Sequence, residues 1–117
     1  TESAGTTVIS CAAHVFDGAP VIAHVFCAAS SPGSSAGCSV LVSLFESTTQ
    51  IARIGYVLIP GTGGFDVPFV GEYRFTPTAA SHTYTVTAAQ AVGNGTLIAG
   101  SGGTGGWPPM FIRFTKV

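Results

Sequence analysis

Charged side chains are scarce in this sequence. Asp, Glu, Lys and Arg make up 8% of its 117 residues, whereas about 25% is typical of soluble domains. The formal net charge is −1, and the basic residues are scattered along the chain: Arg53, Arg74, Arg113 and Lys116. Because nucleic-acid binding needs a basic face, we predict no nucleic-acid partner. A surface of Gly, Ser, Thr and Ala in place of charge predicts a protein partly covered by its neighbours in an assembly.

Long apolar runs and helical patterns are also missing. No stretch of about 18 apolar residues occurs, so no membrane span is predicted, and the start shows no signal-peptide pattern. No segment of three helical turns repeats apolar residues at helical spacing. The length suits one domain. Because the chain begins with Thr1 rather than Met, we expect residues 1–117 to be a single domain from the C-terminal part of a longer chain.

Cysteine occurs three times, at Cys11, Cys27 and Cys38. An odd number leaves at least one thiol free, and a domain of this size does not need disulfides to hold its core together. Cys11 and Cys27 have apolar sequence neighbours, and Cys38 follows a loop from which it could approach either. We therefore expect reduced, buried thiols. No paired Cys/His spacing typical of a zinc site is present.

Strand signals recur at short intervals, with clear turns between them. Glycine, proline and serine mark the turns, for example Ser30–Gly37, Pro60–Gly64 and Pro77–Ser81. About eight strands, with turns every 8 to 12 residues or so, are typical of an antiparallel β-sandwich or barrel. The expected strands are Thr6–Val15, Val21–Ala28, Cys38–Glu46, Ile51–Ile59, Phe65–Thr76, His82–Gln90, Thr96–Ala99 and Met110–Lys116.

The segment SVLVSLFES is apolar on both faces of its expected strand. One face carries Val40, Val42 and Leu44, and the other carries Leu41 and Phe45. A strand buried on one side alone would alternate apolar with polar residues. We therefore predict that this strand lies between the core and a second surface, with Leu41 and Phe45 as candidate contacts to a partner.

The closing segment MFIRFTK also has two faces. Met110, Ile112 and Phe114 alternate with Phe111 and Arg113, so the first set is expected in the core. A hydrophobic strand with a free edge invites aggregation unless a neighbour covers it. We predict that Phe111 and Arg113 face a subunit interface.

Trp107 stands apart from the other aromatic residues. It follows the Gly-rich tract Gly93–Gly106 and precedes Pro108 and Pro109. Two alternatives remain for this ring: it anchors the last strand against the rim of the sandwich, or it is exposed and contacts a partner or ligand. A sugar-binding platform would need more than one exposed ring.

The histidines do not predict a metal site. His14 and His24 lie on consecutive expected strands joined by a tight turn, so a hairpin would bring their imidazoles together. A metal needs a third ligand, and Asp17 lies in the turn several residues away. We predict that these two histidines make local hydrogen bonds and that no metal binds.

No catalytic constellation is apparent either. Adjacent strand residues point to opposite faces, so Ser81 and His82 cannot act together as nucleophile and base. Asp66 and Glu72 share one face but lie about 20 Å apart on a regular strand, too far for paired acid–base catalysis. The glycine tracts lack the strand–loop–helix setting of a phosphate loop. We predict no catalytic residue, no cofactor and no enzymatic activity.

Two segments carry a family resemblance. At TPTAASHTYTV (Thr76–Val86) and WPPMFIRFTKV (Trp107–Val117) the sequence resembles the C-terminal domains of bacteriophage virion proteins of the tail-fibre, head-fibre and decoration type. Those domains carry a TP-x-A-x-S-H-T-Y turn and strand, a Gly/Ser/Ala-rich stretch and a final P-x-F-I-R-x-T-K-V strand. The motifs cover residues 76–117, and residues 1–75 match by strand rhythm.

The resemblance implies a fold and a role. The fold would be a jelly-roll β-sandwich of about eight strands, similar to the complement and tumour-necrosis-factor jelly rolls that assemble as trimers. The role would be structural, as a homotrimeric fibre tip or capsid-surface decoration on the virion that contacts other virion proteins and a host-surface glycan or protein. The alternative is a secreted or cell-surface lectin-like adhesion domain that binds sugars through loops near Trp107 and Pro60–Gly64. A small hydrolase is the third hypothesis, and it fails on the missing constellation.

Overall fold

A computed structural model describes residues 5–32, 37–59, 67–93, 95–100 and 102–117. All regular elements within these ranges are β-strands, which confirms the all-β fold class, and the strands pair antiparallel. No helix in these ranges is long and apolar enough to cross a membrane.

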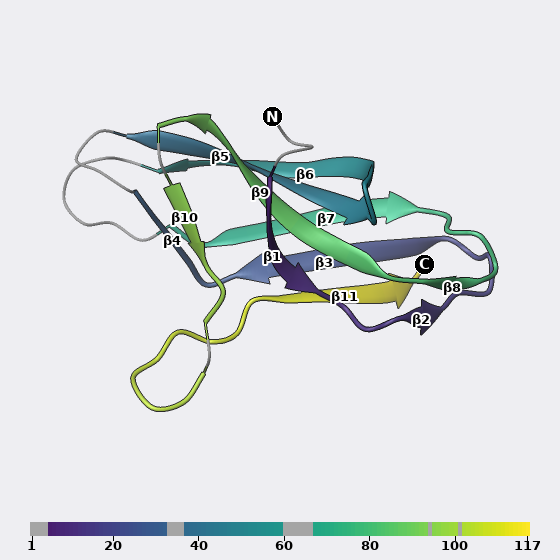
Figure 1. Cartoon of the computed structure of the whole chain (residues 1–117). Coiled ribbons are helices and arrows are strands. Elements are labelled where there is room, and N and C mark those ends of the chain that lie inside the picture. Colours follow the sequence, from purple (N-terminus) through teal and green to yellow (C-terminus); the bar gives the residue numbers. More distant parts are fainter. Residues whose placement is uncertain (1–4, 33–36, 60–66, 94, 101) are drawn as a thin grey trace.

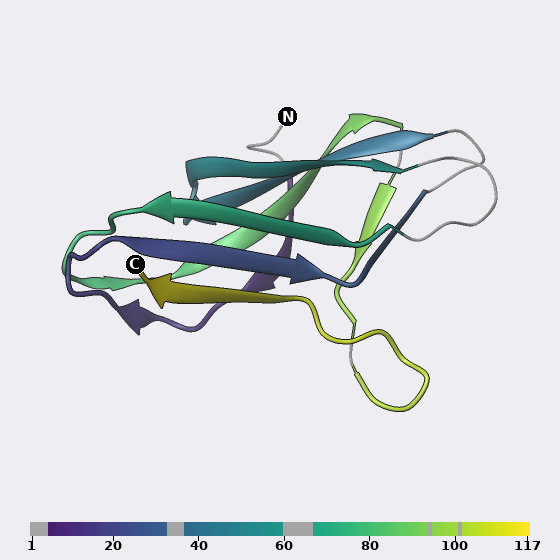
Figure 2. The same ribbon diagram turned by 180° about the vertical axis from the view of Figure 1, so that it is seen from behind.

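Two sheets form the body of the domain and lie face to face (Figures 1 and 2). The four-stranded sheet has the order β1-β9-β5-β6 and the three-stranded sheet the order β11-β3-β7. These strands are β1 (Thr6–Ser10), β3 (Val21–Cys27), β5 (Cys38–Glu46), β6 (Thr49–Ile59), β7 (Phe69–Phe75), β9 (Tyr84–Val92) and β11 (Phe111–Lys116).

Two short ribbons complete the fold. β4 (Ala29–Pro32) pairs with β10 (Gly95–Ile98), and β2 (His14–Val15) pairs with β8 (Ser81–His82). Figure 1 shows the two ribbons at opposite ends of the sheets. The arrangement is sandwich-like, with several small sheets around two larger ones.

The core fills the space between the two larger sheets. Every second residue of β3 is buried, because alternate strand residues point to the same face. Burying one Val or Leu side chain stabilises the fold by about 1.5–3 kcal/mol. The largest cluster of buried residues joins both sheets and comprises Val25, Cys27, Cys38, Val40, Val42, Val57, Ile59, Phe69, Val86, Leu97 and Met110.

Aromatic rings fill the second part of the core. Phe16 lies edge-to-face on Phe114, with ring centroids 5.3 Å apart, and Phe75 lies edge-to-face on Tyr84 at 5.6 Å. Such pairs contribute about 0.5–1.5 kcal/mol beyond the area that they bury. Because Phe114 belongs to β11 and Tyr84 to β9, these rings fasten the last strand to the opposite sheet.

Two glycines make room for the ring of Phe69. A Cβ atom added at Gly55 on β6, or at Gly71 on β7, would lie 2.7 Å from Cζ of Phe69. This is closer than real Cβ contacts come. The ring can therefore lie between the adjacent edges of the two sheets only because both positions lack a side chain.

The structure corrects three expectations about the elements. The strand expected over Thr6–Val15 is two strands, because its two halves pair with different partners: β1 pairs with β9, and β2 pairs with β8. The turn expected over Ser30–Gly37 contains the end of β4. The hairpin expected to join His14 and His24 is wrong, because β2 pairs with β8 whereas β3 pairs with β11 and β7.

Candidate functional site

The outer face of the three-stranded sheet carries an apolar row that crosses all three strands. Phe111 of β11 lies opposite Phe26 of β3, and Phe26 lies opposite Val70 of β7. The rings of Phe111 and Phe26 are stacked with centroids 5.5 Å apart. Phe111 is 42% exposed and Val70 is 67% exposed. These three residues, the apolar row, present a hydrophobic strip to solvent.

A charged row lies next to the apolar row. It consists of Arg113 of β11, His24 of β3 and Glu72 of β7, which the strand register places side by side. The His24 Nδ1 atom lies 3.5 Å from Oε1 of Glu72. The row therefore runs from a positive end at β11 to a negative end at β7. Arg74, two residues beyond Glu72, faces the same way and is exposed.

This face contains two of the side chains singled out by the sequence. Phe111 and Arg113 point outward, while Ile112 and Phe114 on the same strand pack against the core, so the predicted alternation of β11 is confirmed. The pattern did not single out Phe26 or Val70. The alternation in VIAHVFC already placed Phe26 on the face opposite the buried residues, and that signal could have found it.

Trp107 lies outside the two sheets. Its side chain is 45% exposed, in the chain between β10 and β11 that extends away from the sheets in Figure 1. The N–H of Gly102 donates to the Trp107 carbonyl oxygen at 2.9 Å, and Gly100, Gly102 and Gly105 have φ between 73° and 76°. A left-handed backbone of this kind suits glycine. The segment Pro60–Gly64, the other loop expected to bind sugars, is outside the described residues, as is Asp66.

Leu41 and Phe45 lie on the other sheet, and neither is fully exposed. Phe45 is 5% exposed and pairs with Gln50 and Thr85. Leu41 is half-buried between Tyr56 and its neighbours on β9. Phe45 thus offers almost no surface to a partner, because residues on the flanking strands cover it.

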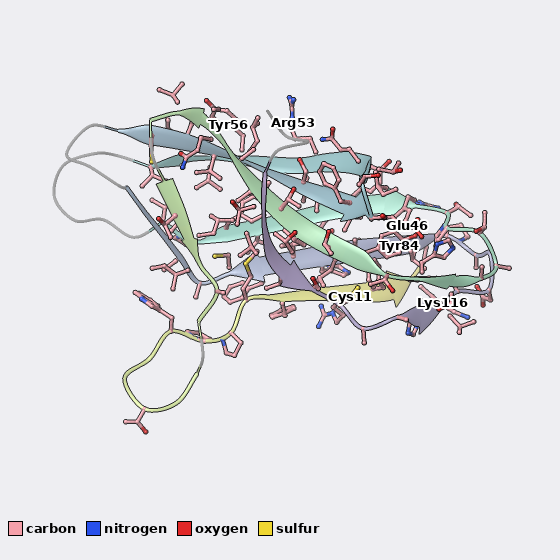
Figure 3. All side chains as sticks on the ribbon, viewed as in Figure 1. Cys11, Glu46, Arg53, Tyr56, Tyr84 and Lys116 are labelled. Carbon is pink, nitrogen blue, oxygen red and sulfur yellow. The ribbon has the colours of Figure 1, made fainter. Side chains whose placement is uncertain are left out.

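The outer face of the four-stranded sheet has its own exposed apolar residues. Tyr56 and Leu58 of β6 are 55% and 70% exposed, and Val92 of β9 is 62% exposed. Figure 3 shows Tyr56 and Arg53 at the upper border of this sheet, on the side away from the three-stranded sheet. The domain therefore exposes apolar side chains on both broad faces.

A pocket of about 510 Å³ opens between β1, β9 and β10. Val40 and Leu97 of the core lie at its wall, and Thr6, Gln90 and Thr96 supply polar groups. Gln90 is held by the backbone of Gly95, whose N–H donates to Oε1 at 2.8 Å. Among the described residues the lining has no charged side chain and no aromatic ring, so it suits a small neutral ligand.

A polar cluster lies at the other end of the sandwich, around His82. Its Nδ1 atom lies 2.6 Å from Oε2 of Glu46, and its Nε2 atom lies 3.0 Å from Oγ1 and 3.1 Å from the carbonyl oxygen of Thr78. Glu46 ends β5 opposite Tyr84 of β9, and Figure 3 shows these two residues close together. The hydrogen bond to Glu46 raises the pKa of His82, and burial raises the pKa of Tyr84 to about 12.

The order Thr78–His82–Glu46 has the outline of a hydroxyl–imidazole–carboxylate triad. A general base must accept the hydroxyl proton at an unprotonated Nε2. The carbonyl oxygen of Thr78 lies about as near to Nε2 as the hydroxyl does, and it accepts a hydrogen bond when Nε2 carries a proton. His82 thus links Glu46 to Thr78 through its two ring nitrogens. Sequence patterns missed this link because Glu46 and His82 are 36 positions apart.

The expectation of buried thiols is confirmed for Cys27 and Cys38 but not for Cys11. Cys27 and Cys38 are buried, Cys11 is half-buried, and all three are free thiols. The Cys11 thiol donates to the Tyr84 carbonyl oxygen at 3.0 Å, and burial raises the pKa of the Cys27 thiol. Both features belong to structural rather than reactive cysteines.

Known proteins give no guide to this face. No family model, curated protein or solved structure matched the chain. Among the described residues, no group of three His, Cys, Asp or Glu side chains is placed to hold a metal ion. The outer face of the three-stranded sheet therefore stands as the candidate site on its own geometry.

Proposed function

We propose that this chain is a jelly-roll domain with a structural, non-enzymatic role, which assembles as a homotrimer on the surface of a phage virion. The carrying observation is the nesting of its strand pairs. The homotrimer and the location on a virion rest on the exposed apolar faces and on the resemblance at Thr76–Val86 and Trp107–Val117.

The main strand pairs are nested like the two arms of one long hairpin. β5 pairs with β6. Beyond β4, whose partner is β10, β3 pairs with β7, and further out β1 pairs with β9. Successive nested pairs lie alternately in the four-stranded and three-stranded sheets. A long hairpin folded over into two facing sheets is the scheme of a jelly roll. In this scheme the outer edge of β11 is the position of one further strand.

The exposed surface favours an assembly role over catalysis. Apolar side chains project from both broad faces of the sandwich, among them Tyr56, Leu58, Val70 and Phe111, and charged residues make up 8% of the sequence. Subunits that bury each other's faces would remove these side chains from water. On a virion, such a domain would form a fibre tip or a surface decoration in contact with other virion proteins and with a host-surface glycan or protein.

The oligomeric state tests this proposal directly. Light scattering coupled to size exclusion, at micromolar concentration, is expected to give three times the 11.8 kDa chain mass. Crosslinking should give a ladder that ends at the trimer. A monomer at that concentration would contradict an assembly role, and a stable dimer would contradict the three-fold arrangement while leaving an assembly role intact.

A lectin-like adhesion domain is the second candidate. The pocket between β1, β9 and β10 favours it, because its hydroxyl and amide groups could bond a neutral sugar. Trp107 is the one tryptophan in the sequence, so its fluorescence reports on any ligand at the loop that carries it. Unchanged fluorescence and unchanged NMR shifts of Thr6 and Gln90 on adding monosaccharides, with no signal on a glycan array, would remove this candidate.

A further inference from the structure

We infer that β11 of one copy of this chain pairs in parallel with β7 of the next copy, and that three such junctions close the homotrimer. The inference rests on the proposed homotrimer and names its subunit contact. β11 and β7 are the two edges of the three-stranded sheet (Figure 1), and within the described ranges each pairs with β3 alone. A contact between two different edges is heterologous, and such contacts can close a ring.

The outer edge of β11 presents unpaired backbone groups at every second residue. The Val117 N–H donates at 3.3 Å to the carbonyl oxygen of Pro20, the residue before β3. Because successive backbone groups of a strand point to opposite sides, the odd-numbered residues of β11 bond β3. The N–H and C=O groups of Ile112, Phe114 and Lys116 therefore point away from β3, and no described backbone group bonds them.

The outer edge of β7 presents a matching set. Val21, the partner of Phe75, and every second residue of β3 after it turn their backbone toward β7, because the residues between them bond β11. The groups that β7 leaves free are those of Val70, Glu72 and Arg74, and in the described chain no backbone group bonds them. Each edge thus offers donors and acceptors at three alternate positions.

One register satisfies these backbone groups and the side chains together. In a parallel pair the hydrogen bonds are slanted, so a residue bonds the two neighbours of the residue opposite it. Glu72 is placed opposite Arg113 of the next copy. Its N–H then donates to the carbonyl oxygen of Ile112, and its C=O accepts from the N–H of Phe114.

This register continues both rows across the junction. Val70, an exposed end of the apolar row, lies beside Phe111 of the next copy, and Glu72, the negative end of the charged row, lies beside Arg113, the positive end. Arg113 forms no ion pair with a described residue, and the imidazole of His24 lies 3.5 Å from Glu72. The two edges are therefore complementary in charge, which identifies the occupant of each edge as the other edge of a second copy.

The other cations at these edges are compatible with the junction. Arg74 comes opposite Thr115 and is the last residue but one of β7, so its guanidinium lies at the open end of the ring. It shares a face with Glu72, two residues before it. Lys116 is paired with Asp17 of its own chain. Each Glu72 thus lies between two arginines, one on its own strand and one on the next copy.

Three junctions join the three-stranded sheets into a ring of nine strands. With the apolar rows turned toward the three-fold axis, side chains fill such a ring, because about eight strands enclose just enough space for them. The rows of Phe111, Phe26 and Val70 then leave water together, which favours assembly. The four-stranded sheets lie outside the ring.

Paired cysteines test the junction directly. Arg74→Cys/Thr115→Cys sets two thiols opposite each other across the junction at about 4.8 Å between strands, a separation that a disulfide spans. Within one chain the two positions flank Ile22, about 10 Å apart and too far for a disulfide. Oxidation should give a covalent trimer on a non-reducing gel. Each single variant, and the wild type with its three free thiols, should run as a monomer.

The matched control pairs β11 with a different edge strand. Thr7→Cys/Thr115→Cys also carries two added thiols on exposed edge residues, on β1 and β11, but the inferred junction does not bring them together. This variant should run as a monomer on the same gel.

Charge reversal adds a test that depends on the number of subunits. Arg113→Glu and Glu72→Arg, each alone, put like charges at all three junctions and should raise the concentration needed for assembly at least about tenfold. The double variant Arg113→Glu/Glu72→Arg should restore assembly. A mixture of the two single variants should recover only in part, because a ring of three cannot alternate two kinds of subunit and keeps one like-charge junction. Copies paired about a two-fold axis would recover fully.

The outcomes separate this inference from the proposed function beneath it. A monomeric wild type would overturn both. A variant Arg74→Cys/Thr115→Cys that is folded by circular dichroism and trimeric by light scattering, yet forms no covalent trimer, would keep the assembly role and overturn the junction. Disulfide-linked dimers of Thr115→Cys alone would show that β11 meets β11, and a covalent trimer of the control would show that it meets β1. Full recovery in the mixture would overturn the ring of three.

Discussion

The ring of Phe69 depends on the absence of two side chains. Gly71→Ala would place a methyl group against the ring and against Ile54, so we expect the free energy of unfolding to fall by about 1–3 kcal/mol. Gly55→Ala should have an effect of similar size. Glu72→Ala, the outward neighbour on the same strand, is the control, with a change within about 0.5 kcal/mol. Urea unfolding measures all three, and equal stability of Gly71→Ala and wild type would contradict the packing described.

His82 gives the stability of the domain a pH dependence. The hydrogen bond to Glu46 raises the pKa of His82 in the folded chain above its unfolded value of about 6.5. A raised folded pKa means that the stabilisation is complete below the unfolded pKa and is lost as the pH rises through the folded pKa. We expect the melting temperature to decline above about pH 6.5.

Two variants isolate the contribution of His82. In His82→Gln the decline above neutral pH should flatten, whereas His14→Gln, on the strand paired with it, should keep the wild-type profile. Differential scanning calorimetry from pH 5 to pH 9 or so covers the range in which a histidine near its usual pKa titrates. A wild type and a His82→Gln variant with parallel profiles would show that this imidazole does not carry the effect.

Single residues were predicted well where alternation decided their direction. Val40, Val42 and Leu44 are buried and Phe111 and Arg113 are outward, as the sequence pattern requires. Alternation alone did not fix the burial of Phe45, because the size of side chains on flanking strands decides whether an outward residue is covered. The hydrogen bond between Glu46 and His82 could not be predicted from the sequence for another reason, because it depends on which strands become neighbours.

At the scale of elements, β11 is an edge strand of the three-stranded sheet. It pairs with β3 on one side, and no other described strand pairs with its second edge. Backbone N–H groups that point away from β3 should therefore exchange with deuterium quickly in the monomer. Those of β3, which has partners on both sides, should exchange slowly.

Hydrogen exchange resolved by NMR measures this difference. The protected and unprotected amides of β11 should alternate along Phe111–Lys116, because successive N–H groups of an edge strand point to opposite sides. β7, the other edge of the same sheet, is the internal comparison. Uniform protection along β11 in a sample shown to be monomeric would mean that its outer edge already has a partner within the chain.

Most of the strands could be predicted from the sequence. β5 was predicted with its exact bounds, Cys38–Glu46, and β3, β6, β9 and β11 within a few residues. β4 was missed because the run SSPGSS is typical of turns, and its pairing with β10 overrides that local preference. The division of Thr6–Val15 was missed because its two halves pair with different strands, β9 and β8, and no local pattern shows which strands become neighbours.

For the whole molecule, Phe111 separates assembly from folding. Phe111→Asp should raise the dissociation constant of the oligomer more than it lowers the free energy of unfolding, because the ring is outward and, within the described ranges, stacks on Phe26 alone. Analytical ultracentrifugation gives the first quantity and chemical denaturation of the dilute monomer gives the second. Phe114→Asp is the contrasting variant and should unfold the chain, since Phe114 packs on the rings of Phe16 and Tyr84. An unchanged oligomer in Phe111→Asp would leave Phe111 an ordinary surface residue.

The order of strands across the sheets could not be predicted from the sequence. Composition and turn spacing limited the chain to an all-β domain, but several sandwiches and barrels satisfy the same pattern. The choice among them depends on contacts such as Thr6 with Ala88 and Val21 with Phe75, which no local signal encodes. The candidate face was partly predictable, because the alternation in β11 and in β3 indicates which of their side chains point outward. The alignment of these side chains into rows depends on the strand register, which the sequence does not show.

The nested pairing also orders the events of folding. β5 and β6 are joined by a short turn at Ser47 and Thr48, so they meet at small entropic cost. Every further pair closes around the one before it, and β1 has to wait for β9, which is made more than 70 residues later. We expect a nucleus at the β5–β6 hairpin and slow growth outward, as in other domains dominated by distant contacts. Until β9 is made, β1 has no partner strand, and it is then that the chain is most exposed to misassembly.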